Sequence, residues 1–297
     1  MLKFIGLGAK RHLGRNESEV CTKGLFLRLW LPAAGVLLAF VLMFPLITGY
    51  TRTVLSGNKP DVVTILAYHK INPDRAAGGL GLRVSPEKFD WQMNYLKNHG
   101  YTVVSMDEAK SFLEGEGTLP PKPVVITFDD GYRDNYIYAW PILKKYHFCA
   151  TIYQVYNSTG GYNFFDADRG VQPRNRMLGW HEIREMRASG MVDFGAHTMD
   201  HPHLTGLDPA EARYQIVTAK NRLEKTLGCR VDHFCYPYGD VNPQVAAMVR
   251  AAGFKTAVTC IQGVNRRKDD PYMLKRIRIM GRYSNRRFVR EITRYTP

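Results

Sequence analysis

The alternation of strand-like and helix-like segments is the feature that most restricts the folds open to this chain. Between these segments lie helix signals such as Ser85-Pro86 and Asp208-Pro209, where a capping side chain precedes proline. Strands that alternate with helices form parallel sheets, because each helix carries the chain back across the sheet. The strand-like runs are Val62–Tyr68, Val124–Phe128, Ala150–Val155, Val192–Ala196, His233–Tyr236, Lys255–Thr259 and Arg276–Ile279. We therefore predict one α/β domain, a barrel of about seven strand–helix units.

An uncharged stretch precedes this domain. Residues 29–51 contain no charged side chain, and at about 1.5 Å per residue a helix of this length crosses a bilayer. A cleaved signal peptide is the alternative, but its apolar part is usually shorter. Residues 1–28 are basic, which predicts a cytoplasmic N-terminus. We expect a single-pass anchor at 29–51, a linker at 52–61 and a domain outside the cytoplasm.

Composition limits the range of functions. The chain has 297 residues, 45% of them hydrophobic, and a net charge of +14. Much of this charge lies near the end of the chain, and residues 284–297 are predicted to form a basic tail. Such a tail could contact lipid head groups or an anionic polymer, or it could simply be solvated. A nucleic-acid partner does not suit a domain outside the cytoplasm, and the sequence leaves the oligomeric state open.

The cysteines do not suggest a zinc–thiolate site, because no Cys-x-x-Cys pair occurs. Cys149, Cys229, Cys235 and Cys260 belong to the predicted exported domain, where two of them could form a disulfide. Sequence does not say which two, and buried free thiols are the simpler expectation.

Polar residues follow several predicted strands where each one ends. In a parallel barrel the carboxyl ends of the strands share one rim, so these side chains are expected to converge there. The residues concerned are His69, Asp129, Asp130, His197, His201, Tyr238 and Arg276.

Two adjacent carboxylates at the end of a buried strand need an explanation. Asp129 and Asp130 could belong to a solvated turn, since Asp and Gly are common there. Alternatively, one of them binds a cation together with His197 and His201, because two imidazoles and one carboxylate make an open zinc-type site. The other carboxylate could then act as a general base. Gly131 is expected to leave room for a ligand at the backbone.

With these residues in view, the chain resembles the polysaccharide deacetylases of the NodB-homology group, carbohydrate esterase family four, over residues 62–283. The resemblance rests on TFDDG at 127–131, HTMDH at 197–201 and YPYG at 236–239. ILAYHKI at 65–71 and LKRIRI at 274–279 are most similar to the poly-N-acetylglucosamine deacetylase subgroup. The resemblance implies a distorted (β/α)7 barrel.

The resemblance also implies roles at matching positions. Asp129 corresponds to the catalytic base, and Asp130 corresponds to a metal ligand together with His197 and His201. The backbone N–H of Tyr238 corresponds to a group that stabilises the oxyanion.

Two positions depart from the family pattern. Many members carry a histidine after the last strand, where this chain has Leu274-Lys275-Arg276, so we expect His69 to act as the general acid. Many also have an arginine at the position of Cys235, so Arg276 is expected to orient Asp129 instead. Trp180 is assigned to the acetyl pocket, with packing at a helix start as the alternative.

These roles imply a metal-dependent hydrolase that removes N-acetyl groups from a hexosamine glycan. Zinc is the expected metal, with cobalt, nickel or iron as alternatives. O-acetyl ester hydrolysis, a lipid-linked sugar substrate, or a non-catalytic glycan-binding subunit remain open. A glycoside hydrolase fits less well, because its two carboxyl groups lie about 5 Å or more apart across the sugar.

Overall fold

The computed structural model describes residues 60–295. The predicted cytoplasmic segment, membrane anchor and most of the linker lie outside the described residues. Within residues 60–295, none of the helices combines the length and the apolar character that crossing a bilayer requires.

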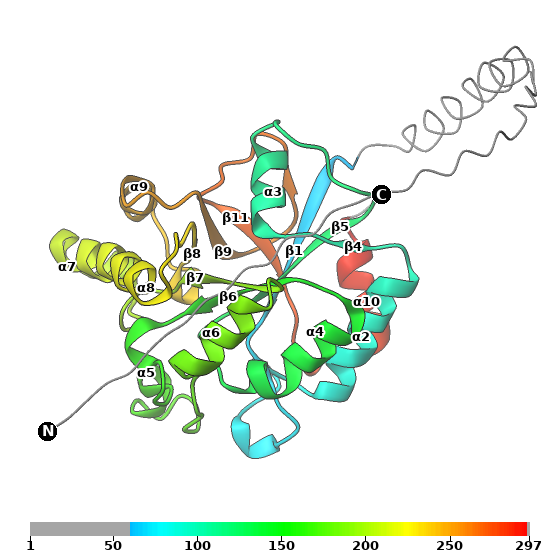
Figure 1. Ribbon diagram of the computed structural model, residues 1–297, viewed down its shortest axis with the longest axis horizontal. Helices are drawn as coiled ribbons and strands as arrows, with labels where there is room; N and C mark the ends of the chain where they lie inside the picture. Colours follow the sequence, from blue (N-terminus) through cyan, green and yellow to red (C-terminus); the bar gives the residue numbers. More distant parts are fainter. Residues whose placement is uncertain (1–59, 296–297) are drawn as a thin grey trace, which may run out of the picture. The chain divides into compact units, whose positions relative to one another are not determined.

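Parallel strands form a closed barrel, with helices around it (Figure 1). The strand Val62–Tyr68 pairs in parallel with Pro123–Phe128 on one side and with Leu274–Arg278 on the other. This double pairing closes the barrel. The predicted α/β barrel is confirmed, and each predicted strand overlaps an observed one. The barrel strands are β1 (Val62–Tyr68), β5 (Pro123–Phe128), β6 (Ala150–Gln154), β7 (Val192–Ala196), β8 (His233–Cys235), β9 (Thr256–Gln262) and β11 (Leu274–Arg278).

Strands β1 and β5 are mostly apolar on both faces because both of their faces are covered. Every residue of β1 and of β5 is buried. One face of each strand fills the barrel interior, and the other face packs against the surrounding helices. This explains why the strand-like runs of the sequence are continuous rather than alternating.

The helix signals of the sequence correspond to observed helix starts. Ser85 caps α2 (Pro86–Asn98), and Ser105 with Glu108 forms a capping box on α3 (Met106–Leu113). The helix signal Asp208-Pro209 begins a helical run of α7 (Pro209–Arg213), a π-helical turn η5 (Tyr214–Thr218) and α8 (Ala219–Leu227). The remaining helices are α4 (Trp140–Tyr146), α5 (Phe164–Ala167), α6 (Trp180–Ala188), α9 (Pro243–Ala251) and α10 (Asn285–Thr293).

Short elements complete the connections. Two-residue strands β2 (Lys70–Ile71) and β3 (Arg83–Val84) pair with each other beside the barrel. The others are β4 (Thr102–Val103), β10 (Asn265–Arg266), the π-helical turn η2 (Asn135–Ala139) and the 3₁₀ turns η1 (Arg75–Ala77), η3 (Tyr156–Ser158), η4 (Leu204–Gly206) and η6 (Pro237–Gly239).

The prediction of a basic tail at residues 284–297 is wrong for its described part. Residues 285–293 form α10, capped by Ser284, and the side chains of Phe288 and Ile292 are buried in the core. Arg286 and Arg290 lie on the exposed side of the same helix. The prediction considered only net charge, whereas the apolar residues recur four apart and give the helix a packing face.

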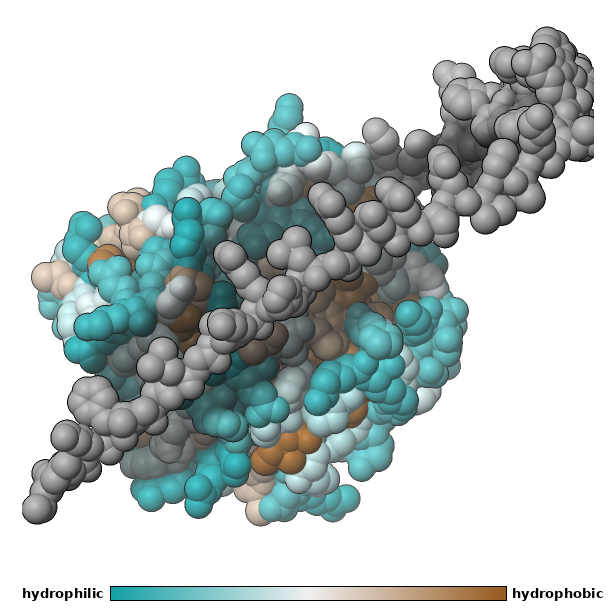
Figure 2. Space-filling model, viewed as in Figure 1, coloured by the Kyte–Doolittle hydropathy of each residue, from teal (hydrophilic) through white to brown (hydrophobic). Residues whose placement is uncertain are grey.

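On the face of the molecule shown in Figure 2, the described surface is mostly hydrophilic, with small, separate apolar patches. Cys149, Cys229, Cys235 and Cys260, the cysteines of the described part, form no disulfide with one another.

Candidate active site

A cavity of about 240 Å³ opens at the carboxyl ends of the barrel strands. The loops that follow β1, β5, β7 and β8 each contribute side chains to its wall. Predicted site residues that line it are His69, Asp129, Asp130, His197, His201 and Tyr238. Residues far apart in the sequence therefore meet as the parallel barrel requires.

Asp130, His197 and His201 converge on one point. The Nε2 atoms of His197 and His201 lie 3.3 and 3.4 Å from Oδ1 of Asp130, and all three side chains are buried. The Nδ1 atom of His197 lies 2.7 Å from the carbonyl oxygen of Cys235. Because a carbonyl oxygen only accepts, this nitrogen carries the proton, and a neutral His197 presents a lone pair at Nε2.

This donor set fits a divalent cation. Two imidazole nitrogens and a carboxylate oxygen that face one another can all bind one cation placed between them. Ligand atoms bound at about 2.0–2.1 Å to a tetrahedral ion lie about 3.3 Å apart, which matches the observed separations. Burial alone would raise the pKa of Asp130, but the two imidazoles outweigh burial and hold that pKa well below its ordinary value. The carboxylate is therefore ionised and available as a ligand.

The backbone at this point is conformationally strained. Asp130, Thr198, His201 and Tyr238 have φ values of 73°, 68°, 62° and 59°, a region that non-glycine residues rarely adopt. The hydroxyl of Thr198 accepts a hydrogen bond of 2.9 Å from the backbone N–H of His201, which stabilises the turn. Strain concentrated in the ligand-bearing loops indicates that side-chain placement takes precedence over backbone preference here.

Asp129 forms a buried pair with Arg276. The two terminal nitrogens of Arg276 donate to the two carboxylate oxygens of Asp129 at 2.7 and 2.8 Å. Arg276 also donates to the carbonyl of Thr259 and to the hydroxyl of Thr127. Burial would raise the pKa of Asp129, but the charge and hydrogen bonds of Arg276 outweigh it, so the pKa lies below its ordinary value. Asp129 is thus held ionised in one orientation.

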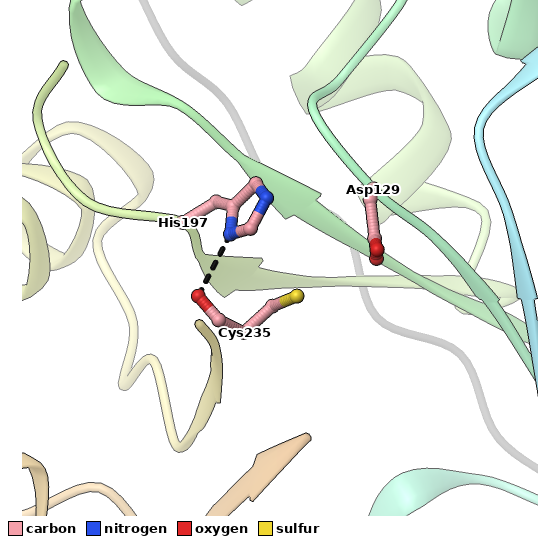
Figure 3. A group of neighbouring side chains, drawn as sticks. All are labelled: Asp129, His197 and Cys235. Carbon is pink, nitrogen blue, oxygen red and sulfur yellow. Dashed lines mark hydrogen bonds between the residues drawn. The ribbon is translucent and has the colours of Figure 1, made fainter. Parts of the chain in front are cut away.

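A second group of candidate ligands, Asp129, His197 and Cys235, overlaps the first (Figure 3). This group suits a cation less well. Both oxygens of Asp129 are already bonded to Arg276, and the sulfur of Cys235 lies 3.4 Å from the same guanidinium. A divalent ion there would face a fixed positive charge, so we assign the metal site to Asp130, His197 and His201.

His69 also lies close to Asp129. Its Nε2 is 3.8 Å from Oδ2 of Asp129, and the side-chain amide of Asn135 donates to its backbone carbonyl at 2.8 Å. Burial lowers the pKa of His69, and the opposing effect of Asp129 and Asp130 does not compensate. His69 is consequently neutral at rest and has room to exchange a proton with Asp129.

Tyr238 lines the cavity and packs beside the metal ligands. Its ring lies 4.5 Å from that of His201 and stacks on His203 at 4.0 Å. Tyr238 is the second residue of the turn η6, where an N–H group has no acceptor within the turn. This backbone donor is available to a bound ligand.

Two expectations do not hold. Trp180 is not among the described residues that line the cavity; it begins α6, and its ring packs 5.4 Å from that of Tyr156. Packing at a helix start, the alternative weighed above, describes it. Gly131 does not leave room for a ligand, because a Cβ there would lie 2.0 Å from Oε1 of Gln154. That space is already filled by protein.

Several cavity residues have no counterpart in the sequence prediction. They are Leu82, Asp166, Val171, Gln172, Tyr236, Cys260 and Arg278. Arg278 follows Arg276 by two positions on β11, so the period-two pattern of a strand could have found it. Asp166 lies on α5, within a long connection whose course the sequence does not reveal.

Comparisons with known proteins agree with this geometry. The family described as "Polysaccharide deacetylase" matches residues 116–257. YxkH of Bacillus subtilis, named for the same family, is 30% identical over 77% of this chain and 75% of its own length. A poly-beta-1,6-N-acetyl-D-glucosamine N-deacetylase of Staphylococcus aureus is 28% identical over 66% of this chain and 67% of its own. The structure of IcaB from Ammonifex degensii has a TM-score of 0.69 and 26% identity, covering 79% of this chain and 97% of that one.

Proposed function

The chain belongs to the polysaccharide deacetylase family, and we propose that it removes N-acetyl groups from a polymer of N-acetylglucosamine with the help of a divalent metal. The observation that carries the proposal is the buried convergence of Asp130, His197 and His201 beside the Asp129–Arg276 pair. The similarity to a poly-beta-1,6-N-acetyl-D-glucosamine deacetylase supports the choice of glycan.

Space beside the cavity suits a polymer. An open depression of about 830 Å³ is lined by Arg83 and Pro173, which are sequence neighbours of Leu82 and Gln172 in the cavity wall. A sugar in the cavity would therefore have room for its neighbours along the chain.

Asp130, His197 and His201 would hold the metal, and zinc suits two imidazoles and a carboxylate. When bound, the cation polarises the acetyl carbonyl and lowers the pKa of the attacking water toward neutrality. The remaining steps are assigned to groups of the chain itself.

Asp129 accepts the proton of the attacking water, and Arg276 holds both of its oxygens in place while it does so. The developing negative charge is stabilised by the N–H of Tyr238. His69 donates a proton to the departing nitrogen. Because His69 is neutral at rest, its proton must arrive during turnover, and Oδ2 of Asp129 at 3.8 Å is the nearby source. The products are acetate and a free amine.

Acetate release tests the proposal. The substrates are poly-β-1,6-N-acetylglucosamine, chitin oligomers, peptidoglycan and an O-acetylated glycan, each with added zinc or with a chelator. We expect zinc-dependent release from the first substrate and about 100- to 10,000-fold less from Asp129→Asn. Release of acetate only from the O-acetylated glycan, or activity that withstands complete metal removal, would contradict the proposal.

We also propose that residues 29–51 anchor the protein in the cell membrane, with the catalytic domain on the outer side. The absence of charge over these residues and the basic segment before them support this topology. The full-length chain should be found in the membrane fraction. Protease added to intact spheroplasts should remove the catalytic domain. Recovery of the full-length chain in the soluble fraction would exclude an anchor.

A further inference from the structure

Within residues 60–295, two charged side chains that line the cavity make no side-chain hydrogen bond and no ion pair. Asp166 is only 7% exposed and lines the cavity, and no group of residues 60–295 donates a hydrogen bond to its carboxylate, so its oxygens are open to the cavity. Arg278 lines the same cavity, and its Nε is buried without an acceptor. Arg278 is half-buried and Asp166 is largely buried. Polar groups withdrawn from bulk water are normally hydrogen-bonded, so a ligand in the cavity is the natural source of the missing hydrogen bonds.

Both residues are held at defined places. Arg278 lies on β11 and pairs in register with Ala67 of β1. Asp166 lies on α5, where the ring of the preceding Phe165 packs 4.5 Å from the ring of His201. This ring contact holds α5 beside His201, one of the residues assigned to the metal site. Two bridges, Tyr132 with Met177 and Tyr162 with Arg176, tie the surrounding connection down.

The two charges do not neutralise each other. No ion pair joins Asp166 to Arg278 within the described chain, although both line one cavity. A cationic ligand would meet Arg278, and an anionic one would meet Asp166, Asp129 and Asp130. A neutral sugar ring suits both sides, because each hydroxyl group can donate to a carboxylate and accept from a guanidinium.

We propose that Asp166 binds a pair of neighbouring free hydroxyl groups on the sugar that reacts, with Arg278 of the same cavity donating hydrogen bonds to oxygens of that sugar. This inference rests on the proposed function and goes beyond it by naming what selects the substrate. An unpartnered carboxylate offers two oxygens side by side, which matches two adjacent hydroxyl donors.

The consequence is selection by linkage. A β-1,6-linked residue keeps its 3- and 4-hydroxyl groups free, whereas an internal β-1,4-linked residue has lost the 4-hydroxyl to the glycosidic bond. Asp166 therefore favours β-1,6-linked chains. On a β-1,4-linked chain, the residue at the non-reducing end is the one that retains both hydroxyls.

The test combines Asp166→Asn with a substrate lacking one hydroxyl. The substrates are a β-1,6-linked trimer of N-acetylglucosamine and the same trimer with 4-deoxy sugar in the middle. For the unchanged protein we expect kcat/KM at the middle residue to fall about 10- to 100-fold on the deoxy trimer, the effect of one hydrogen bond to a charged group. On the parent trimer, kcat/KM of Asp166→Asn should already lie about 10- to 100-fold below that of the unchanged protein, mainly through a higher KM. Changing to the deoxy trimer should lower kcat/KM of this variant by less than about threefold more.

Asp168→Asn is the matched control. Asp168 lies two positions away, bonds to the hydroxyl of Tyr162 and is not among the lining residues. It should retain the full penalty of the deoxy trimer. With a β-1,4-linked pentamer, mass spectrometry should find the unchanged protein acting at the non-reducing end.

The outcomes separate this inference from the proposed function. If the unchanged protein, loaded with zinc, releases no acetate from either linkage, the proposed function is wrong and the inference falls with it. If it is active but the deoxy trimer reacts equally well, Asp166 does not bind these hydroxyls. The same conclusion follows if the loss of kcat/KM caused by Asp166→Asn and the loss caused by the deoxy sugar multiply. If Asp166→Asn fails to fold, the kcat/KM values of the unchanged protein and of Asp166→Glu on the parent and deoxy trimers still test the proposal.

Discussion

The two ends of the barrel contain similar ionisable residues but differ in how those residues are surrounded. At the carboxyl ends, two histidines face Asp130 at 3.3 and 3.4 Å, and the Asp130 side chain is 5% exposed. At the amino ends, His233 lies 3.5 Å from Asp107 and 3.8 Å from Asp193, whose side chains are 68% and 50% exposed.

Burial and convergence separate these two groups. Among the described residues, the ligand atoms of Asp130, His197 and His201 come within 4.8 Å of one another, and those of the His233 group do not. Water screens Asp107 and Asp193, so no cation is required between them and His233. A histidine with two nearby carboxylates is therefore not a metal site unless the fold excludes water and brings the ligand atoms together.

The largest expected effect comes from removing a metal ligand. Asp130→Asn should lose its bound zinc and lower kcat/KM by about 1,000-fold or more, because the metal supplies several kcal/mol of transition-state stabilisation. Zinc content by mass spectrometry and acetate release measure the two effects. Asp193→Asn, the matched change at the amino ends, should stay within about twofold; an equal loss there would break the distinction.

Next in size is the loss of the buried pair. Arg276→Met leaves the carboxylate of Asp129 buried without its partner, which should lower the free energy of unfolding by about 3–5 kcal/mol. The counterpart is Lys255→Met, which breaks a partly exposed ion pair with Asp232 at the amino ends and should cost about 1 kcal/mol or less. Urea denaturation of both variants compares them, and similar losses would contradict the role of burial.

Asp134 tests burial by pH. It lies beyond β5, and burial raises its pKa to about 6. Its ionisation therefore destabilises the fold as pH rises from about 4 to 6, by about 3 kcal/mol when complete. The stability of Asp134→Asn relative to the unchanged protein should accordingly rise between pH 4 and pH 7, as measured by urea denaturation at each pH.

Asp107 should show the opposite sign at the amino ends. A hydrogen bond with His233 lowers the pKa of Asp107, so its contribution is present above the ordinary pKa and is lost as pH falls below it. Relative to the unchanged protein, Asp107→Asn should lose stability as the pH rises from below to above the ordinary pKa of an aspartate. If the stability of Asp134→Asn relative to the unchanged protein also falls as the pH rises, burial does not control the ionisation of the Asp134 carboxyl.

The smallest effect is expected for Asp107→Asn at constant neutral pH. The pair with His233 is exposed on the carboxylate side, so its loss should change the free energy of unfolding by about 1 kcal/mol or less, and by less still in 1 M salt. A loss of several kcal/mol, unaffected by salt, would mean that the amino ends hold a buried pair after all.

Much of the fold could be predicted from local sequence. The strand runs are long and apolar, and capping residues mark where α2, α3 and α9 begin. These signals depend on neighbours a few residues away. The basic tail failed as a prediction because net charge hides the periodicity that buries Phe288 and Ile292.

The candidate site could be predicted in part. Parallel topology alone brings the residues after β1, β5, β7 and β8 to one rim, which is why Asp130, His197 and His201 could be named together. Trp180 and Gly131 could not be assigned, because their surroundings are Tyr156 and Gln154, side chains from other segments.

The sequence by itself determined the order of strands and helices and the chemical groups available at strand ends, since periodicity and capping act over short distances. Only the tertiary structure decided which of those groups lose their water. It paired Arg276 with Asp129, left the amino-end carboxylates hydrated and placed Asp166 in the cavity wall, where no side chain of residues 60–295 forms a hydrogen bond with it. Burial and convergence depend on contacts between distant segments, so no local pattern in the chain encodes them.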